Sequence, residues 1–274
     1  MIKQSLSFLF LIAFLVSCNA HKNEPSQKVS DNHALSVLFE NYYTERMQLV
    51  PIESTQNGDS VNNDKLYPDF TDSYRNKYKL FFQHYLDEIN KYDRNTLSEN
   101  DQLSYDVFKK EMQTTLEGLQ LGWFANAVIM PDHCYIPFNQ FSGIPLWMGQ
   151  SGSGEGSQPF KTVKDYDNWL KRTDGFAIWT DSAIVYFRKG ITANVMLPQQ
   201  LVKKMIDEMK AMVVTDPAKS LFYGPVTHIP ASFSDSDRLH ITVALTDAIK
   251  QKIIPSYKKL ADFLQSEYLP KART

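Results

Sequence analysis

Apolar side chains recur every three to four residues through most of this chain, which is the spacing of one face of an α-helix. Short segments rich in proline, glycine, asparagine and serine separate these stretches and favour turns. The pattern predicts helices over residues 33–50, 71–89, 98–121, 162–190, 198–209 and 234–264. Residues 52–70 are predicted to form a loop after Pro51 ends the first helix. Residues 122–130 are apolar without a clear period and fit either a buried helical turn or a short strand.

The same spacing predicts which side chains point into the core. The second helix carries one broad aromatic face, which includes Tyr74, Tyr78, Phe81, Phe82 and Tyr85. We expect Leu103 and Val107 of the third helix to point inward, and Leu239 and Val243 of the last helix to do the same. Pro255 lies within the last helix and is expected to kink it, because proline removes a backbone donor.

Residues 132–158 break this helical periodicity. Pro137, Pro145 and a run of glycines that begins at Gly143 all interrupt helices. Aromatic side chains are interspersed among them, namely Tyr135, Phe138, Phe141 and Trp147. We therefore predict a mainly α fold, in which amphipathic helices surround a central non-helical segment and there is little or no sheet. This segment is the first candidate for a ligand-facing surface.

The N-terminus resembles an export signal. An apolar run at residues 6–16 follows Lys3 and is too short to span a membrane comfortably. The run ends in Leu15-Val16-Ser17-Cys18, which resembles a bacterial lipobox, where the chain is cut before a cysteine whose sulfur then carries a diacylglycerol. The alternative is an ordinary secretion signal followed by a chance cysteine.

This pattern predicts the organisation of the whole chain. We expect a signal peptide over residues 1–17, lipidation at Cys18, a flexible tether over residues 18–32 and a helical domain over residues 33–274. Asn19 replaces the aspartate that would signal retention in the inner membrane. The expected location is therefore the cell envelope, with a lipid anchor in the outer membrane and either face possible.

Composition and charge narrow the possible functions. The chain has 274 residues, 43% of them hydrophobic, which is enough for one large helical domain or two small ones. Its formal net charge is -2 and no basic stripe occurs, so nucleic-acid binding has no electrostatic support. If Cys18 is acylated, Cys134 has no cysteine partner. Cys134 could act as a nucleophile with His133, but adjacent residues of an extended chain point apart, so a small buried hydrophobe is favoured.

No complete catalytic set stands out in the sequence. The six histidines include no H-E-x-x-H pair, and His84 and Glu88, one turn apart, fit a solvated or core-edge pair better than a metal site. Residues 149–156 are rich in glycine and serine but lack the lysine of a phosphate-binding loop. We favour a flexible surface loop there over a lid that covers a cleft.

Several short motifs, in their order and spacing, resemble a known family. These are P-I-E-S-T-Q-N-G-D at residues 51–59, Y-I-P-F-N-Q-F-S-G at 135–143, residues 190–198, I-P-S-Y at 254–257 and L-P-K-A-R at 269–273. From about Phe39 to Thr274 the chain resembles the N-terminal half of the bacterial family known as domain of unknown function 885. The resemblance implies a helical, metallopeptidase-like fold in which longer members carry an H-E-x-x-x-H-like zinc motif in their C-terminal half.

The same resemblance implies an activity, the hydrolysis of a peptide or related amide by a metal-activated water. No position of this sequence matches the metal ligands or the glutamate base, so zinc is expected only with the absent C-terminal half. We therefore expect a substrate-cleft half that is inactive by itself. Its expected partners are the membrane through Cys18, a peptide substrate and that C-terminal half. The alternative is a non-catalytic, lipid-anchored helical binding or scaffold module.

The candidate cleft residues lie in the segment at 135–143. Asn139, Gln140 and Ser142 could bond a peptide backbone beside Gly143, while Tyr135 could pack on a side chain. The alternative is that Asn139 and Gln140 satisfy the backbone of their own loop. Separately, we expect the last helix to expose apolar surface around Leu260 and Leu264 and so to promote association.

Overall fold

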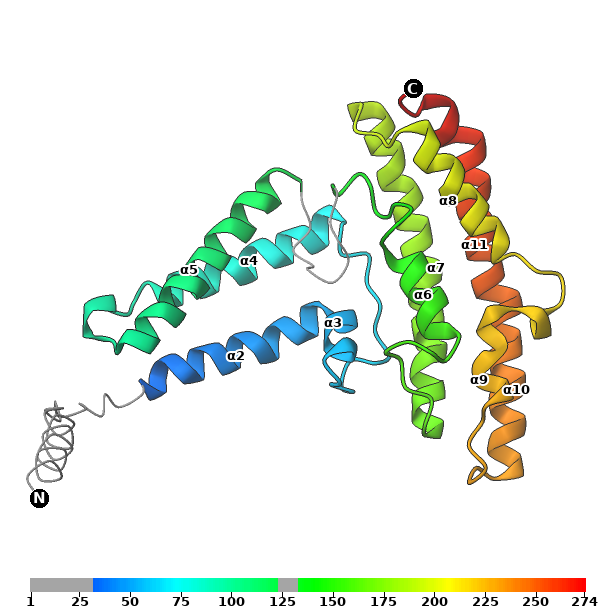
Figure 1. The fold of residues 1–274 in the computed structure, drawn as a ribbon, viewed down its shortest axis with the longest axis horizontal. Helices are drawn as coiled ribbons and strands as arrows, with labels where there is room; N and C mark the ends of the chain where they lie inside the picture. Colours follow the sequence, from blue (N-terminus) through cyan, green and yellow to red (C-terminus); the bar gives the residue numbers. More distant parts are fainter. Residues whose placement is uncertain (1–31, 123–132) are drawn as a thin grey trace, which may run out of the picture.

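The computed structural model describes residues 32–122 and 133–274 (Figure 1). It confirms the mainly α fold, and no β-strand occurs in either described range. The α-helices are α2 (His33–Leu49), α3 (Pro51–Gln56), α4 (Asp72–Ile89), α5 (Glu99–Gln120), α6 (Ile144–Gly152), α7 (Val163–Ala193), α8 (Gln199–Ala211), α9 (Gly224–Thr227), α10 (Asp235–Ala248) and α11 (Ile254–Phe263). The prediction for residues 122–130 falls almost entirely outside the described residues.

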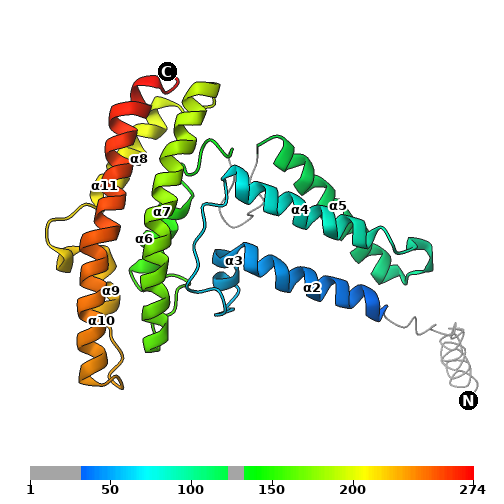
Figure 2. The same cartoon turned by 180° about the vertical axis from the view of Figure 1, so that it is seen from behind.

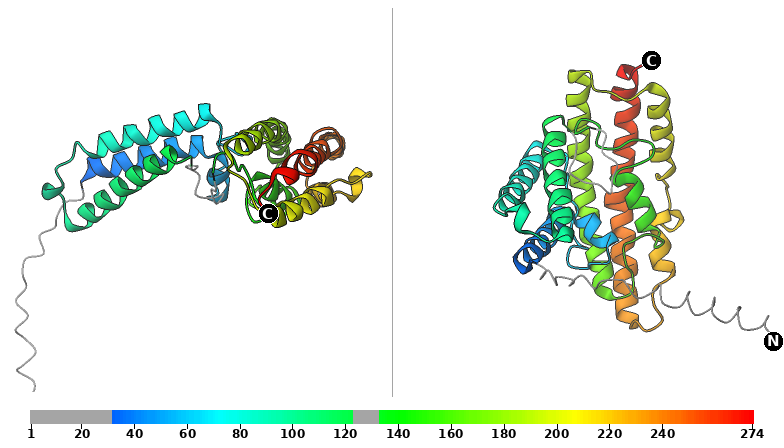
Figure 3. Two further views of the ribbon diagram at one scale, coloured as in Figure 1. Left: turned by 90° about the horizontal axis from the view of Figure 1, so that it is seen from above. Right: turned by 60° about the vertical axis from the view of Figure 1, so that its left-hand side comes forward.

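The helices form two groups that run crosswise to each other. Helices α2, α4 and α5 form an N-terminal layer, and α6 to α11 form a C-terminal bundle around the long helix α7 (Figures 1 and 2). The layer extends away from one side of the bundle when the molecule is seen from above (Figure 3). Helix α3 lies where the two groups meet, so the joint between them is made by the segment from α3 to the start of α4.

Side-chain caps fix the start of several helices. The Thr162 hydroxyl accepts the Asp165 N–H while the Asp165 carboxylate accepts the Thr162 N–H, which is a full capping box at the start of α7. Ser98 caps α5 and Ser234 caps α10 in the simpler way, through a hydroxyl that accepts one N–H. Asn32, which we assigned to the tether, caps α2 through its side-chain oxygen.

The N-terminal layer is held together by aromatic side chains. Tyr42 of α2 contacts Tyr85 of α4 at 5.1 Å and Phe108 of α5 at 4.8 Å between ring centroids, both edge to face. The Tyr74 hydroxyl donates to the Leu49 carbonyl at 2.9 Å and so satisfies the end of α2. The predicted aromatic face of α4 is therefore core, as expected from its spacing.

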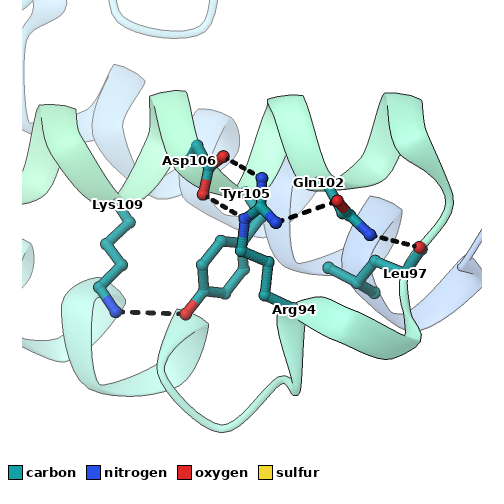
Figure 4. Close-up of polar contacts among 6 residues, drawn as sticks. All are labelled: Arg94, Leu97, Gln102, Tyr105, Asp106 and Lys109. Carbon is teal, nitrogen blue, oxygen red and sulfur yellow. Dashed lines mark hydrogen bonds and ion pairs between the residues drawn. The ribbon is translucent and has the colours of Figure 1, made fainter.

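Polar contacts fasten the far tip of the layer, where the chain turns from α4 into α5 (Figure 4). The Arg94 guanidinium binds the Asp106 carboxylate with two hydrogen bonds, at 2.8 and 2.6 Å, and also donates to the Gln102 side chain at 3.0 Å. The Gln102 amide donates in turn to the Leu97 carbonyl. The Arg94 guanidinium lowers the pKa of Asp106, which keeps this exposed pair charged in the neutral range.

The C-terminal bundle has the larger core, built on the inner face of α7. Trp169, Phe176, Trp179 and Phe187 of this helix are almost completely buried. Helix α8 packs along α11, and the residues buried by α11 and the turn after it include Tyr257, Leu260 and Leu264. The expectation of exposed apolar surface around Leu260 and Leu264 is therefore wrong, because α8 covers that face.

One fully buried arginine links the joint segment to the bundle. The Arg172 side chain of α7 donates to the carbonyls of Lys65 (3.1 Å), Asn62 (3.0 Å) and Pro51 (3.2 Å), to the Thr55 hydroxyl, and to the Gln158 side-chain oxygen. The guanidinium also lies 5.1 Å from the centroid of the Trp147 ring. Burial lowers the pKa of Arg172 to about 9, which still leaves the group charged at neutral pH.

The last helix passes Pro255 through a wider turn. A π-helical turn at Ile249–Ile253 precedes the proline, and α11 continues directly from it. The Ser256 hydroxyl donates to the Lys252 carbonyl at 2.7 Å, within the region where proline supplies no N–H. A second π-helical turn, Leu264–Tyr268, follows α11 and precedes Pro270.

Other expectations about individual residues are wrong. Leu103 and Val107 are exposed, because α5 instead buries a neighbouring face that carries Tyr105, Phe108 and Met112. Leu239 and Val243 are exposed for the same reason on α10, where the inward side chains include Ile241 and Leu245.

Two predicted loops contain helices. Residues 51–56 form α3, because Pro51 supports the first turn of a new helix just after the previous helix has ended. Ile144–Gly152 form α6 within the stretch predicted to be non-helical, again with a proline in the first turn. The central irregular segment is therefore shorter than predicted, and within the described residues it covers chiefly residues 133–143 and 153–162.

Candidate substrate-facing surface

Residues 133–143 lie against α7 and are held there by backbone contacts and buried side chains. The Phe138 ring lies 5.4 Å from the Phe187 ring of α7, edge to face, and is almost completely buried. At Gly190 an added Cβ would come within 2.9 Å of the Tyr135 carbonyl oxygen. Glycine is therefore required at this point of α7 for the 135–143 segment to approach so closely.

A turn around Asn139 shapes the outer part of this segment. The Asn139 side-chain oxygen accepts the N–H groups of Phe141 (2.7 Å) and Ser142 (3.1 Å), and the Asn139 N–H donates to the Ser142 carbonyl. Gly143 has a φ of 125°, and a Cβ there would meet the Phe138 Cβ at 2.3 Å. Asn139, Ser142 and Gly143 thus build the turn itself, which is the structural alternative that we weighed for Asn139.

The turn presents two side chains outward. Phe141 is 73% exposed, which is unusual for a large aromatic side chain and leaves its ring available for contact. Gln140 is partly exposed, and its amide makes no side-chain hydrogen bond to a described residue. Of the five candidate residues, Gln140 and Tyr135 therefore take no part in the side-chain hydrogen bonds that form this turn.

Tyr135 lines a groove of about 460 Å³ on the outer face of α7. The other lining residues are Val185, Arg188, Lys189, Thr192 and Ala193. The Tyr135 ring also lies 6.4 Å from the Tyr186 ring, which belongs to the same helix. One wall of the groove is therefore aromatic, and the other carries two cations.

Both cations are already paired with carboxylates. Arg188 binds Glu267 with two hydrogen bonds, at 2.8 and 2.7 Å, and Lys189 binds Asp72 of α4 at 2.7 Å. The Lys189 hydrogen bond lowers the pKa of Asp72, and the same contact raises the pKa of Lys189. The groove is therefore polar at its rim without carrying an unpaired cation there.

His133 and Cys134 lie closer together than predicted. The chain turns at Cys134 rather than running extended, and the Cys134 Sγ lies 3.7 Å from the His133 Nδ1. However, the same Nδ1 accepts the Tyr135 N–H at 3.1 Å, so its lone pair is engaged. Burial raises the pKa of the Cys134 thiol and lowers the pKa of His133. Both shifts favour the neutral groups, so the thiolate and the imidazolium of an activated pair are disfavoured.

The side chains of the other candidate metal pair, His84 and Glu88, contact neighbouring residues of their own helix region. Glu88 forms an ion pair with Lys91, while His84 packs its ring 5.0 Å from the neighbouring Tyr85 ring. Within residues 32–122 and 133–274, no group of three or more histidine, cysteine, aspartate or glutamate side chains is placed to hold a metal ion. The first part of the glycine-rich stretch belongs to α6, and the remainder lines a groove of about 520 Å³ together with Tyr166 and Pro225.

Comparison with known families identifies the chain. Residues 51–274 match the family described as "Bacterial protein of unknown function (DUF885)". The chain belongs to this family. The assignment confirms the resemblance inferred from the motifs at 51–59, 135–143 and 254–257.

A solved structure shares the fold of this DUF885 chain. It is titled "The crystal structure of the putative lipoprotein from Colwellia psychrerythraea" and superimposes with a TM-score of 0.71 at 13% sequence identity. The superposition covers 89% of this chain and 42% of that chain, so the DUF885 chain spans less than half the length of the protein it resembles. No curated protein matches the sequence.

Some predictions for the DUF885 chain concern residues that the structure does not describe. Cys18, the signal peptide at residues 1–17 and nearly all of the tether lie outside the described residues. In the described ranges, no helix combines the length and the apolar character that crossing a membrane requires.

Sequence reasoning missed the α7 wall of the groove. Val185, Arg188 and Lys189 lie outside the buried stripe of α7, and their pattern resembles any solvated helix face. The one available signal was Gly190, because a glycine inside a strongly periodic helix indicates the close approach of another segment.

Proposed function

We propose that this chain is the N-terminal, substrate-cleft part of an exported, lipid-anchored zinc-dependent hydrolase that cleaves peptides or related amides. Membership of the DUF885 family and a fold shared with a protein titled a lipoprotein support the export and anchoring part of this proposal. In this proposal Cys18 carries the anchor, in the cell envelope and at the outer membrane. The chain by itself binds substrate but does not cleave it.

The observation that carries the proposal is the pairing of a rigid turn with a groove. The turn at Asn139 holds the exposed Phe141 ring outward, while Tyr135 of the same segment forms one wall of the α7 groove. Both aromatic residues belong to one segment whose backbone is fixed against Gly190. A ligand that lies along this segment meets two aromatic surfaces without reorganisation of the backbone, which lowers the cost of binding.

These side chains suit an extended peptide. Phe141 and Tyr135 offer apolar surface to peptide side chains, and aromatic rings are enriched where proteins bind peptides tightly. The Gln140 amide has both donor and acceptor atoms, which are what a peptide backbone requires. Arg188 and Lys189 sit beside the groove, but their pairing with Glu267 and Asp72 makes them part of its frame.

The described residues do not fit a zinc site, and no hydrolytic step is assigned to them. No three ligating side chains converge in either described range, whereas zinc sites use three or four protein ligands. The match covers 42% of the related protein chain. The proposal therefore assigns zinc to a part of the fold that lies beyond the matched 42%. The role of the present residues is to bind and orient the substrate.

A binding experiment tests the recognition part of the proposal. A library of fluorescent peptides is titrated into the purified chain, and Kd is measured for those that bind. Phe141→Ala and Gln140→Ala are expected to weaken binding about tenfold, the effect of removing an interface contact worth about 1.4 kcal/mol. Leu80→Ala is the matched control, since Leu80 is 64% exposed on α4, away from the groove. Equal effects of all three variants, or no binding at all, would contradict the proposal.

A turnover experiment tests the catalytic part. The chain is incubated with the bound peptides, with and without zinc, and the products are analysed by mass spectrometry. We expect no cleavage in either case. Zinc-dependent cleavage by this chain alone would show that it is not merely a recognition half, and cleavage that survives a strong chelator would contradict zinc dependence. Binding by a family protein that never cleaves would favour the non-catalytic module.

A further inference from the structure

Two exposed aliphatic side chains lie one turn apart at the far end of the N-terminal layer. Leu103 is 65% exposed and Val107 is 60% exposed, and both belong to α5. They border an open hollow of about 330 Å³, whose remaining lining residues are Phe39, Ser104, Phe108 and Glu111. Because four of these six residues are apolar, the hollow continues the apolar surface of the dyad formed by Leu103 and Val107.

The chain enters the described structure beside this dyad. The first described residue, Asn32, donates its N–H to the Asp101 carboxylate at 3.2 Å, two positions before Leu103 on α5. The start of α2 and the start of α5 lie together at the end of the layer that points away from the bundle (Figures 1 and 2). The segment before Asn32 therefore joins the described structure at this end of the molecule. Any anchor on that segment is connected to this end.

We propose that the Leu103–Val107 dyad rests on the lipid bilayer that holds the acylated Cys18. This inference depends on the lipid anchor of the proposed function. From residue 18 to residue 31 the chain can reach at most roughly 50 Å, at about 3.3–3.6 Å per extended residue. The anchor therefore keeps the tip of the layer within roughly 50 Å of the membrane, and this tip is the part of the described structure to which the tether is joined.

The charges around the dyad are compatible with a bilayer surface. Asp106 is paired with Arg94 (Figure 4). The Glu111 carboxylate borders the hollow and accepts the Tyr42 hydroxyl at 2.9 Å, and the exposed Glu99 lies one turn before Leu103 on the same face of α5. Lys110 follows the dyad on α5 and is exposed, which allows it to meet an anionic headgroup. The contact is thus apolar at its centre, and its border carries the basic Lys110, the Arg94–Asp106 pair and the exposed acids Glu99 and Glu111.

The anchor makes a small patch sufficient. The lipid anchor already holds the protein at the membrane, and a second contact on the same molecule then acts at a high effective concentration. Two aliphatic side chains would not hold a free protein at a membrane. They are enough to orient a protein that is already attached, which places the groove on α7 at a fixed distance from the lipid surface.

A fluorescent probe at each of two matched positions tests this inference. The lipidated chain is prepared as Leu103→Cys or Leu239→Cys, labelled with an environment-sensitive dye, and reconstituted into phosphatidylethanolamine vesicles with a minority of phosphatidylglycerol. Leu239 is the control because it is 68% exposed and pairs with Val243 at the same spacing on α10, across the bundle from the layer (Figure 1). The native Cys134 is buried and should label poorly.

We expect a shift of the dye emission to shorter wavelength, and quenching by lipid-borne quenchers, at position 103 only. Val107→Glu should abolish that shift in the Leu103→Cys chain, whereas Val243→Glu should change nothing at position 239. Acylated Cys18 with a water-exposed probe at 103 would overturn this inference alone and leave the anchor intact. A mass spectrum without an acyl chain on Cys18 would overturn the anchor and this inference together. Shielding at 103 before vesicles are added would assign the dyad to a second copy of the chain.

Discussion

The N-terminal layer and the C-terminal bundle are both helical, but their cores are built differently. The layer relies on tyrosines whose hydroxyls find partners at the edge of the core, as Tyr42 does with Glu111 and Tyr74 with the Leu49 carbonyl. The bundle buries larger side chains more deeply, and the indole N–H groups of Trp169 and Trp179 have no hydrogen-bond partner among the described residues. The layer is therefore a thin assembly with polar edges, and the bundle is a deep apolar one.

This difference shows how the two regions depend on each other. The layer has the smaller buried core, so we expect it to open locally at a lower free energy than the bundle. It is joined to the bundle by the buried Arg172, by Phe70, whose ring packs edge to face on Trp179 at 5.5 Å, and by the exposed pair of Asp72 with Lys189. We expect the buried links to contribute most of the free energy that couples the layer to the bundle. Substitutions at the buried and exposed links can therefore test the comparison.

The largest expected effect follows from removing the buried link. Arg172→Met removes the hydrogen bonds that the buried guanidinium donates to the carbonyls of Pro51, Asn62 and Lys65. We expect unfolding to become easier by about 3–5 kcal/mol, because several buried hydrogen bonds from a charged group are lost together and each contributes about 1.5–3 kcal/mol. Urea denaturation measures the free energy of unfolding, and hydrogen exchange should show faster opening of α3 than of α11.

The matched control for that variant is Arg188→Met. Arg188 lies on the same helix and its side chain is 53% exposed in a pair with Glu267, so its removal should cost less than about 1 kcal/mol. If both variants lose the same stability, the buried guanidinium does not couple the two regions and the comparison drawn above fails.

Two glycine substitutions in helix α6 are expected to change the free energy of unfolding by intermediate amounts and in opposite directions. At Gly152 an added Cβ would lie 2.4 Å from the Phe222 ring and 2.6 Å from the Trp169 ring, so Gly152→Ala should destabilise by about 1–3 kcal/mol through overpacking. At Gly149, three residues earlier, nothing lies closer than 3.6 Å, and Gly149→Ala should stabilise by about 0.5–1 kcal/mol. Thermal denaturation compares the two, and the same sign for both would contradict the tight packing of the bundle.

The smallest expected effect concerns the exposed link. The hydrogen bond from Lys189 lowers the pKa of Asp72 in the folded state, so the pair adds stability that is fully present above about pH 4 and is lost as pH falls through the lowered value. Because the Asp72 side chain is 72% exposed, Asp72→Asn should cost only about 0.5 kcal/mol at pH 7 and nothing at pH 2. Urea denaturation at the two pH values provides the test. A loss that is equal at both would show that the charge is irrelevant.

Much of the fold follows from the sequence, because helical spacing and caps act locally. The long helix α7 was anticipated from its capping residues and apolar stripe, although it continues to Ala193, past Gly190. The choice between two apolar faces on one helix could not be predicted. Leu103 and Val107 compete with Tyr105 and Phe108 for the inside of α5, and only the tertiary arrangement decides which pair is buried.

The candidate site divides in the same way. The 135–143 segment could be found from its prolines and aromatic residues, whereas the groove on α7 depends on how that segment docks. Arg172 was missed, although it lies on the buried stripe between Trp169 and Phe176, where a charged residue at an apolar position is a signal of a buried network. The predicted geometry of His133 and Cys134 was wrong because the chain forms a turn there and is not extended. Neither residue type predicts that turn.

The two π-helical turns near the C-terminus determine which side of the helix axis the later side chains point to. Each holds one residue more than an α-helical turn would, and one residue rotates the subsequent side chains by about 100° around the axis. Deleting a single residue from Ile249–Ile253 would keep the chain helical yet swing Tyr257 away from the Pro145 carbonyl of α6 and the Phe176 ring of α7, and Leu260 out of the core. Among family members, gaps and insertions should therefore be rarer in this stretch than its uninterrupted helical appearance suggests.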